Sequence, residues 1–316
     1  MNQNPLISII VPSYNHGHLI HRALNSILAQ TYLYWEVIIV DNHSSDETEE
    51  IVSNFSEKRF RFYKINNNGV IAASRNFGIK KALGEWIAFL DSDDWWEPEK
   101  LDNAINYASK RNADLVFHNL KIVRKFFLPF GRSIGFYDHS KSAFNNLLYG
   151  GNSIPNSSVV IKKSTLQAVN LISEDKLKIS WEDYDCWLKV SKLTNNFAYL
   201  DENLGFYWLG GGNISNPYRT LQNLESIYLE YMSALSTPPP FWFSYSLASA
   251  LIQCGYYKDS FNILRKITLK NIPPLNRLKY CIRYAQSLIL KQTSNANYKN
   301  MKTFICYNLK QKNYDE

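Results

Sequence analysis

The first hundred residues alternate between short apolar runs rich in β-branched residues and segments with helical spacing of apolar residues. Strand-like runs occupy residues 6–11, 36–40, 60–65 and 85–90. Helical patterns lie between them: one at 19–28, one that begins after Ser45 as its N-cap, and one at 72–83. Single helices between successive strands indicate right-handed crossovers and parallel pairing. This part of the sequence therefore predicts an α/β fold with a mostly parallel sheet flanked by helices.

Polar residues follow three of these runs, at the ends where open α/β sheets bind ligands. The turn after the first run consists of Pro12, Ser13, Tyr14 and Asn15. Tyr14 could stack on a nucleobase or pack as an ordinary loop aromatic. Asp41 and Asn42 follow the second run, where a carboxylate or amide can read a base edge or a ribose hydroxyl. We expect these groups to share one crevice.

The fourth run ends in the acidic sequence Asp91-Ser92-Asp93-Asp94. Like charges this close are costly unless a cation is present, and carboxylate oxygens suit Mg²⁺ or Mn²⁺. The alternative is an acidic turn in which Asp94 caps the next helix. Arg75, at the start of the third helical segment, could bind a phosphate or a base carbonyl with its planar fork, or form a surface salt bridge.

A second acidic pair, Glu182 and Asp183, stands at the start of a helical pattern that covers 183–193. One of these carboxylates could serve as a general base near a sugar-binding aromatic such as Trp181. The alternative is that both only cap the helix and interact with its dipole. Further on, the glycine-rich stretch 207–213 is either a lid or a plain linker.

Charge divides the chain into two predicted parts, 1–216 and 217–316. The first carries 22 basic and 23 acidic side chains, whereas the second carries 13 and 5. Helical patterns at 221–235, 243–254, 260–267 and 275–290 make the second part a basic, tyrosine-containing helical region. This excess is either a solvated face, a surface for anionic membranes, or a site for nucleic acid.

Cysteine usage and missing motifs narrow the function classes. The four cysteines are widely spaced, with no C-x-x-C pair and no signal peptide ahead of them, which favours reduced thiols in a cytoplasmic protein. No strand is followed by G-x-G-x-x-G or by a P-loop sequence. Dinucleotide-dependent oxidoreductases and P-loop NTPases are therefore disfavoured. The six histidines show no metal-binding spacing.

Taken together, the motifs resemble the family-2 glycosyltransferases. The resemblance covers roughly the first hundred residues in order, spacing and context. It rests on SIIVPSYN at 8–15, QTY at 30–32, WEVIIVDN at 35–42, ASRN at 73–76, and GEWIAFLDSDD at 84–94. The resemblance implies a GT-A type domain over residues 1–216. It also implies transfer of a sugar from a nucleotide-diphosphate sugar, with inversion at the anomeric carbon.

The resemblance also assigns roles by position. The 12–15 turn with Tyr14 would hold the base, Asp41 and Asn42 would sit at the uracil or its equivalent, and Arg75 would lie near the nucleotide. Asp91, Ser92 and Asp93 would form the D-x-D motif, with Asp93, together with Asp91, as metal ligand. Asp183 would be the catalytic base, with Glu182 as the alternate.

These implications give a specific set of expectations. We expect Mn²⁺ or Mg²⁺, a nucleotide-diphosphate sugar, namely a UDP-sugar, as donor, and a cell-surface glycan or lipid-linked oligosaccharide as acceptor. We expect a cytoplasmic enzyme, peripheral at the inner face of the cytoplasmic membrane through residues 217–316, with no nucleic-acid partner. Two alternatives remain at this point. One is a nucleic-acid-binding protein, and the other is a sugar nucleotidyltransferase, which would need a glycine-rich basic loop in place of Pro12–Asn15.

Overall fold

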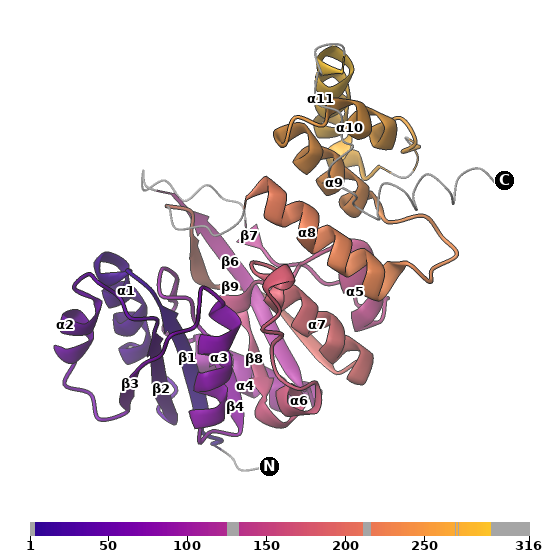
Figure 1. Cartoon of the computed structure of the whole chain (residues 1–316). Coiled ribbons are helices and arrows are strands. Elements are labelled where there is room, and N and C mark those ends of the chain that lie inside the picture. Colours follow the sequence, from indigo (N-terminus) through magenta and orange to yellow (C-terminus); the bar gives the residue numbers. More distant parts are fainter. Residues whose placement is uncertain (1–3, 125–132, 211–215, 269, 271, 292–316) are drawn as a thin grey trace. The chain divides into compact units, whose positions relative to one another are not determined.

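The computed structural model describes residues 4–124, 133–210, 216–268, 270 and 272–291 (Figure 1). The chain forms two compact units. The first comprises Met1–Leu147 and Asn152–Asn213, and the second comprises Leu148–Gly151 and Ile214–Glu316. The predicted division between 216 and 217 stays a prediction.

The first unit is built on one nine-stranded sheet in the order β3-β2-β1-β4-β8-β6-β9-β5, with β7 paired to β6. The strands are β1 (Ile7–Ser13), β2 (Trp35–Asp41), β3 (Phe60–Lys64), β4 (Trp86–Phe89), β5 (Trp95–Trp96), β6 (Leu115–Val123), β7 (Ser133–Ile134), β8 (Val160–Lys162) and β9 (Phe197–Trp208). Strands β1 to β4 are parallel as predicted. Beyond β4 the sheet is mixed, because β8 runs antiparallel to both β4 and β6 while β6 and β9 are parallel. The α/β fold class is confirmed.

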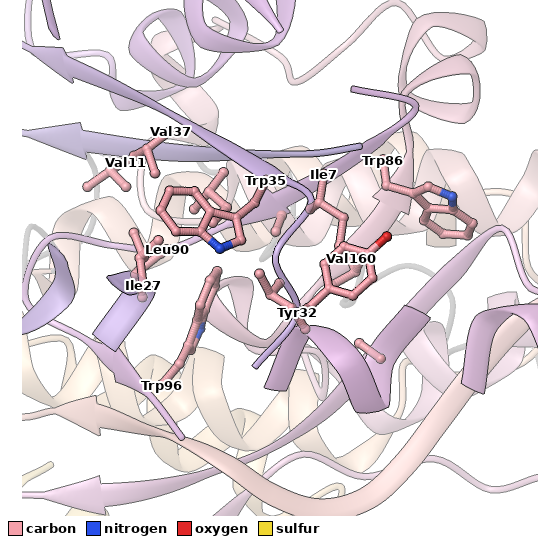
Figure 2. Packing of buried hydrophobic residues seen from close by; sticks show 14 of the residues in the cluster. Ile7, Val11, Ile27, Tyr32, Trp35, Val37, Trp86, Leu90, Trp96 and Val160 are labelled. Atoms are coloured by element: carbon pink, nitrogen blue, oxygen red, sulfur yellow. The ribbon is translucent and has the colours of Figure 1, made fainter. Parts of the chain in front are cut away.

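Helices cover both faces of this sheet. They are α1 (Gly17–Leu28), α2 (Thr48–Ser53), α3 (Ile71–Lys81), α4 (Lys100–Arg111), α5 (Ala143–Gly150), which contributes to both units, α6 (Lys163–Ala168) and α7 (Glu182–Leu193). Alternate residues of a strand point to opposite faces. Ile9 and Val37 therefore pack with α1 and α4, and Figure 2 shows this side of the core around Trp35 and Trp96. On the other face Phe89 contacts Trp187 of α7, with ring centroids 6.1 Å apart.

Three local expectations are wrong. Ser45 does not cap α2, because the Asp46 carboxylate accepts hydrogen bonds from the backbone N–H groups of both Gly17 (2.9 Å) and Thr48 (3.1 Å), at the starts of α1 and α2. The expected strand at 157–162 is a 3-10 turn, Asn156–Ser158, followed by the short β8. The start of the expected glycine-rich loop, residues 207 and 208, ends strand β9. Gly211 and Gly212 lie outside the described residues.

The second unit is helical where it is described, as the sequence predicts for 217–316. It contains α8 (Pro217–Ile227), the π-helical segment Tyr228–Met232, α9 (Phe241–Gln253), α10 (Tyr257–Leu264), the 3-10 turn Pro274–Asn276 and α11 (Arg277–Leu290). Its small core includes Ala248, Leu264 and Tyr280. Across the described ranges, no helix has both the length and the apolar content that a membrane crossing requires.

A close approach of α3 to β1 depends on Gly78. A Cβ added at this position would lie 2.6 Å from Cγ2 of Ile10, which is fully buried in the sheet. Glycine is normally a poor helix residue, so its presence here is explained by packing. The same helix carries Arg75, and the contact therefore helps to set the depth of that side chain.

We expect Gly78→Ala to lower the free energy of unfolding by about 1–3 kcal/mol, because overpacking outweighs the better helix propensity of alanine. Urea denaturation followed by circular dichroism measures this. Gly150→Ala is the matched control, since a Cβ there meets nothing within 4 Å. Equal stability of the Gly78→Ala protein and the wild type would contradict the packing argument.

Candidate active site

The carboxyl ends of β1 and β2 place two predicted loops side by side. Ser13 pairs with Asp41 in the parallel register, and the Asn42 N–H donates to the Ser13 carbonyl at 2.9 Å. The Asp41 side chain is fully buried, and its carboxylate accepts hydrogen bonds from the N–H and the hydroxyl of Ser44. In this structure Asp41 therefore shapes the loop.

Tyr14 is exposed and Asn42 is half-buried at the ends of these two strands. Tyr14 is 56% exposed, so its ring is open to a planar ligand. Asn15, next to it, has a positive φ of 51°, and its Oδ1 accepts from the Ser45 N–H at 2.8 Å. The Asn42 Oδ1 accepts from the Asn67 N–H at 2.9 Å, which fixes the amide at the rim of the loop. A base-sized ring can thus be met by an aromatic face and an oriented amide.

Arg75 of α3 joins the two acidic motifs that the sequence singled out. Its Nη2 lies 2.7 Å from Oδ1 of Asp91, and its Nη1 lies 2.6 Å from Oε1 of Glu182. The arginine side chain is only 4% exposed. The neighbouring carboxylates raise the arginine pKa, so the guanidinium stays charged despite its burial, which acts in the opposite direction. A surface salt bridge, one of the two alternatives for Arg75, is therefore wrong.

The carboxylates of the Asp91–Asp94 turn have different surroundings: one is held by structural hydrogen bonds, and another is open to a ligand. The two oxygens of Asp94 accept from the Ser157 hydroxyl (2.6 Å) and from the Trp208 N–H (2.9 Å). Asp94 therefore does not cap α4, which follows Glu99. The half-buried Asp93 carboxylate accepts a hydrogen bond from its own backbone N–H, and no other described residue forms a hydrogen bond or ion pair with it. Burial and the Asp91 charge raise the pKa of Asp93 to about 7.

Asp183 is the more open member of the second acidic pair. Glu182 is buried and bound to Arg75, whereas Asp183 is half-buried and its side-chain partner, the Asn152 amide, lies at the longer distances of 3.3 and 3.4 Å. Its Oδ1 also accepts from the Tyr184 N–H at 2.6 Å. Burial and the charge of Glu182 raise the pKa of Asp183 to about 7. A carboxylate with such a pKa can accept a proton near neutral pH.

His16 connects the loops after β1 and β2 to the acidic turn, although no role is predicted for the histidines from the sequence. His16 Nδ1 and Ser92 Oγ lie 2.7 Å apart. The pKa of this histidine is lowered by burial and by His18, so the neutral form is favoured. This contact explains why Ser92, the central residue of the D-x-D sequence, is buried.

The Arg22 side chain supports the acidic turn from α1. Its guanidinium carbon lies 4.5 Å from the ring centroids of both Trp95 and Trp208, and its Nη2 donates to the Asp93 carbonyl at 3.2 Å. A Cβ at Gly210 would lie 2.0 Å from the Trp208 indole, so the chain folds closely over that ring. Arg22 therefore fixes the Asp93 backbone and the end of β9 at the same time.

A divalent cation fits the open part of this acidic turn. Within the described ranges no three acidic, histidine or cysteine side chains form a preassembled metal cluster. Mg²⁺ and similar ions commonly use only one or two protein carboxylates, with waters and substrate phosphates completing the shell. The carboxylate of Asp93, with its raised pKa, and the neighbouring Asp91 match that donor set.

Several contributors were not predicted from the sequence. Asn156 donates to Asp91 at 3.2 Å, Ser157 holds Asp94, and Asn152 faces Asp183. A polar cluster before the β8 run is the only signal for them, and it also fits an ordinary turn. The predicted residues form two groups. One consists of residues 12–15 and 41–42 at the ends of β1 and β2, and the other consists of Arg75 with Asp91, Asp93, Glu182 and Asp183.

Comparison with solved structures supports the fold. The fold resembles S. aureus TarS 1–349 in complex with UDP-GlcNAc, with a TM-score of 0.61 and 22% identity over 92% of this chain and 81% of that chain. It also resembles the mannosyltransferase PcManGT from Pyrobaculum calidifontis in complex with GDP-Man and Mn²⁺, with a TM-score of 0.57 and 16% identity over 92% and 86% of the two chains. These likenesses establish the fold.

Sequence similarity gives the family. The model of Glycosyl transferase family 2 matches residues 8–164. The Escherichia coli protein UDP-Glc:alpha-D-GlcNAc-diphosphoundecaprenol beta-1,3-glucosyltransferase WfgD is 34% identical over 223 residues, which cover 69% of this chain and 83% of that protein. The chain belongs to glycosyl transferase family 2, as its motifs predict, and is a glycosyltransferase.

We expect Arg22→Ala to lower the free energy of unfolding by about 1–2 kcal/mol through loss of the cation–π contacts. It should also lower sugar transfer from a nucleotide-sugar donor, because the Asp93 backbone loses its support. Arg59→Ala is the matched control, since Arg59 lies 3.4 Å from the Trp35 ring centroid, away from the acidic turn. Equal effects of both variants on transfer would contradict a role for Arg22 at the site.

Proposed function

We propose that the protein is a metal-dependent, inverting glycosyltransferase that transfers a sugar from a UDP-sugar to a lipid-linked or cell-surface glycan. The observation that carries this is the Arg75 bridge, which ties up Asp91 and Glu182 and leaves Asp93 and Asp183 open in one unit. The WfgD relative is named for UDP-Glc as donor and for a diphosphoundecaprenol-linked acceptor. These names support the donor and acceptor classes.

The nucleotide is proposed to bind at the ends of β1 and β2. Tyr14 stacks on the base and Asn42 meets its edge, while Pro12, Ser13 and Asn15 give the loop its shape. Asp41 contributes by holding Ser44, whose hydroxyl accepts from the Asn15 N–H at 2.8 Å. Arg75 and Ser92 are proposed to act near the nucleotide from buried positions, where Arg75 holds Asp91 and Ser92 contacts His16.

Asp93 is the proposed metal ligand, with the neighbouring Asp91 as the second carboxylate. A bound Mn²⁺ or Mg²⁺ would supply positive charge against the diphosphate leaving group. The residues around the turn keep these carboxylates in place: Ser157 and Trp208 hold Asp94, Arg22 holds the Asp93 carbonyl, and Arg75 holds Asp91.

Asp183 is the proposed general base that removes a proton from the acceptor hydroxyl. Its raised pKa of about 7 and its partial exposure suit this role. Glu182 is less suited, because its Oε1 is bound to the permanently charged Arg75 and its side chain is buried. We therefore assign Glu182 a positioning role toward Arg75.

The division of labour along the chain is also a proposal. Residues 1–216 form the catalytic domain, and the basic region 217–316 binds an anionic membrane surface at the cytoplasmic side. The similarity to a family-2 relative with a lipid-linked acceptor in its name supports this arrangement over the nucleotidyltransferase and nucleic-acid-binding alternatives.

We expect Asp183→Asn to reduce transfer by about a thousandfold, because the base is lost while shape is kept. Transfer is measured with UDP-glucose and a short-chain GlcNAc-diphospholipid as acceptor, with NMR of the product to show whether the anomeric configuration is inverted. Glu182→Gln serves as the comparison and should retain more activity. If Glu182→Gln were the more damaged variant, with both proteins folded, the two carboxylates would have to exchange roles.

The pH profile provides an independent check on the base. Because only the deprotonated form of Asp183 accepts a proton and its pKa is raised to about 7, transfer should fall as pH drops below neutrality. At saturating Mn²⁺, which keeps the Asp93 carboxylate deprotonated, the expected slope of log kcat/KM is about one per pH unit on the acidic side. Under the same conditions the residual activity of Asp183→Asn should lack this acidic limb. An unchanged limb in that variant would place the titration on another group.

We expect Asp93→Asn to raise the Mn²⁺ concentration needed for half-maximal UDP release by at least about tenfold. Chelation by EDTA should abolish the activity of the wild type, and added Mn²⁺ should restore it. Asp102→Asn, on α4, is a control for the loss of one negative charge. A wild-type enzyme that is fully active in EDTA would refute the metal-dependent mechanism.

A further inference from the structure

Helix α11 (Arg277–Leu290) uses its two faces differently. On one face Tyr280 donates its hydroxyl to the Leu264 carbonyl at 2.9 Å, and Tyr284 lies 5.5 Å from Phe261 between ring centroids. Ser287 on this face is fully buried. These contacts fix the helix in the core of the second unit, so the opposite face is turned away from that core.

The opposite face is apolar and exposed. Leu278, Ile282 and Ile289 are 72%, 60% and 69% exposed, and with the exposed Ala285 they follow a spacing of four, three and four residues. Such spacing puts all four on one stripe, about 17 Å long at 1.5 Å per residue. Elsewhere in the described part of this unit the large exposed apolar or aromatic side chains are Tyr149, Tyr218, Leu229 and, off the stripe on α11, Leu288. The three most exposed of all these side chains lie on the one stripe, which indicates an interaction surface.

Positive charge flanks this stripe. Arg277 and Lys279 are exposed near its start, on either side by helical position, and Arg283 follows on the side of Lys279. The sequence contains no Asp or Glu between Asp259 and Asp315. An apolar stripe with basic margins is the pattern of a helix that lies in the interface of an anionic bilayer.

We propose that the Leu278–Ile289 face of α11 inserts into the headgroup region of an anionic phospholipid bilayer. A second copy of this chain fits less well, because pairing the faces would bring basic margins together. Nucleic acid also fits less well, because the centre of the surface is apolar. Interfacial insertion needs no spanning segment, and within the described residues no helix is long and apolar enough to span.

This inference deepens the proposed function and rests on it in one respect: a lipid-linked acceptor gives the enzyme a reason to reach the bilayer surface. The surface itself is argued from the exposure and charge of α11. Binding to vesicles and turnover can therefore be measured separately, and each can fail without the other.

The test is sedimentation of the full-length protein with vesicles of equal parts phosphatidylglycerol and phosphatidylcholine, compared with pure phosphatidylcholine. We expect the wild type to sediment with the anionic vesicles. The double variant Ile282→Asp/Ile289→Asp should lower partitioning at least about tenfold, because apolar area is lost and charge is added. The double variant Arg277→Glu/Lys279→Glu should lower it at least about fivefold per residue on anionic vesicles alone.

Matched controls use the same substitutions in the first unit. Leu33 and Leu83 are 69% and 73% exposed, so Leu33→Asp/Leu83→Asp controls for the apolar change. Lys80→Glu/Lys110→Glu, at exposed lysines of α3 and α4, controls for the change in net charge. Both controls should retain vesicle binding. Circular dichroism should confirm that all four variants fold, and UDP release without acceptor should stay at the wild-type rate.

The outcomes separate the two proposals. Loss of sedimentation in the α11 variants alone, with unchanged UDP release, supports the inference. Wild-type protein that stays in the supernatant while releasing UDP overturns the membrane surface and leaves the enzyme assignment intact. Vesicle binding without any UDP-sugar turnover overturns the enzymatic proposal alone. A dimer that dissociates on Ile282→Asp/Ile289→Asp, with no vesicle binding, shows that the face joins two copies and overturns the inference.

Discussion

The buried guanidinium of Arg75 is the group on which the arrangement of the site depends. It contacts Asp91 after β4 and Glu182 at the start of α7, two positions far apart in sequence. Removing one partner from a buried ion pair typically costs about 3–5 kcal/mol, because it leaves a charge uncompensated. The bridge therefore fixes the positions of α3, β4 and α7 relative to one another, and with them the positions of the side chains that these elements contribute to the site.

The same bridge explains why the carboxylates within each acidic motif have different roles. Arg75 binds Asp91 and leaves Asp93 with a hydrogen bond from its own backbone N–H alone among the described residues, and it binds Glu182 and leaves Asp183 half-exposed. Burial and a neighbouring carboxylate raise the pKa of both open groups to about 7. At neutral pH such groups take up a cation or a proton readily, which is what the proposed mechanism requires of Asp93 and Asp183.

Sequence patterns predicted what depends on local periodicity. The strands β1 to β4 and the helices between them follow from apolar spacing, and their parallel pairing follows from the crossovers. The pairing of β6 with β9 joins segments about eighty residues apart, and no local signal encodes it. The sequence likewise predicts a longer strand at β8. It does not predict the 3-10 turn before β8, because contacts of Ser157 with Asp94 set that turn.

The candidate site shows the same limit at the level of side chains. Residue type and position predicted functional roles for Arg75, Asp93 and Asp183, and these roles stay predictions. Residue type and position did not show that the partners of Arg75 are protein carboxylates, since a guanidinium binds phosphate and carboxylate equally well in principle. The sequence does not predict the role of Arg22, because a single arginine on an amphipathic helix normally faces solvent and its aromatic partners lie in β5 and β9.

The apolar residues on the exposed face of α11 are not needed for the folding of the second unit. Tyr280, Tyr284 and Ser287 already supply the contacts to the core of the second unit. Leu278, Ile282 and Ile289 add no burial, and exposed apolar side chains of this size reduce solubility. Stability alone would be served by polar residues at these positions. The apolar stripe is therefore best explained by a partner outside the folded chain, and the absence of acidic residues from 260 to 314 favours one with negative charge.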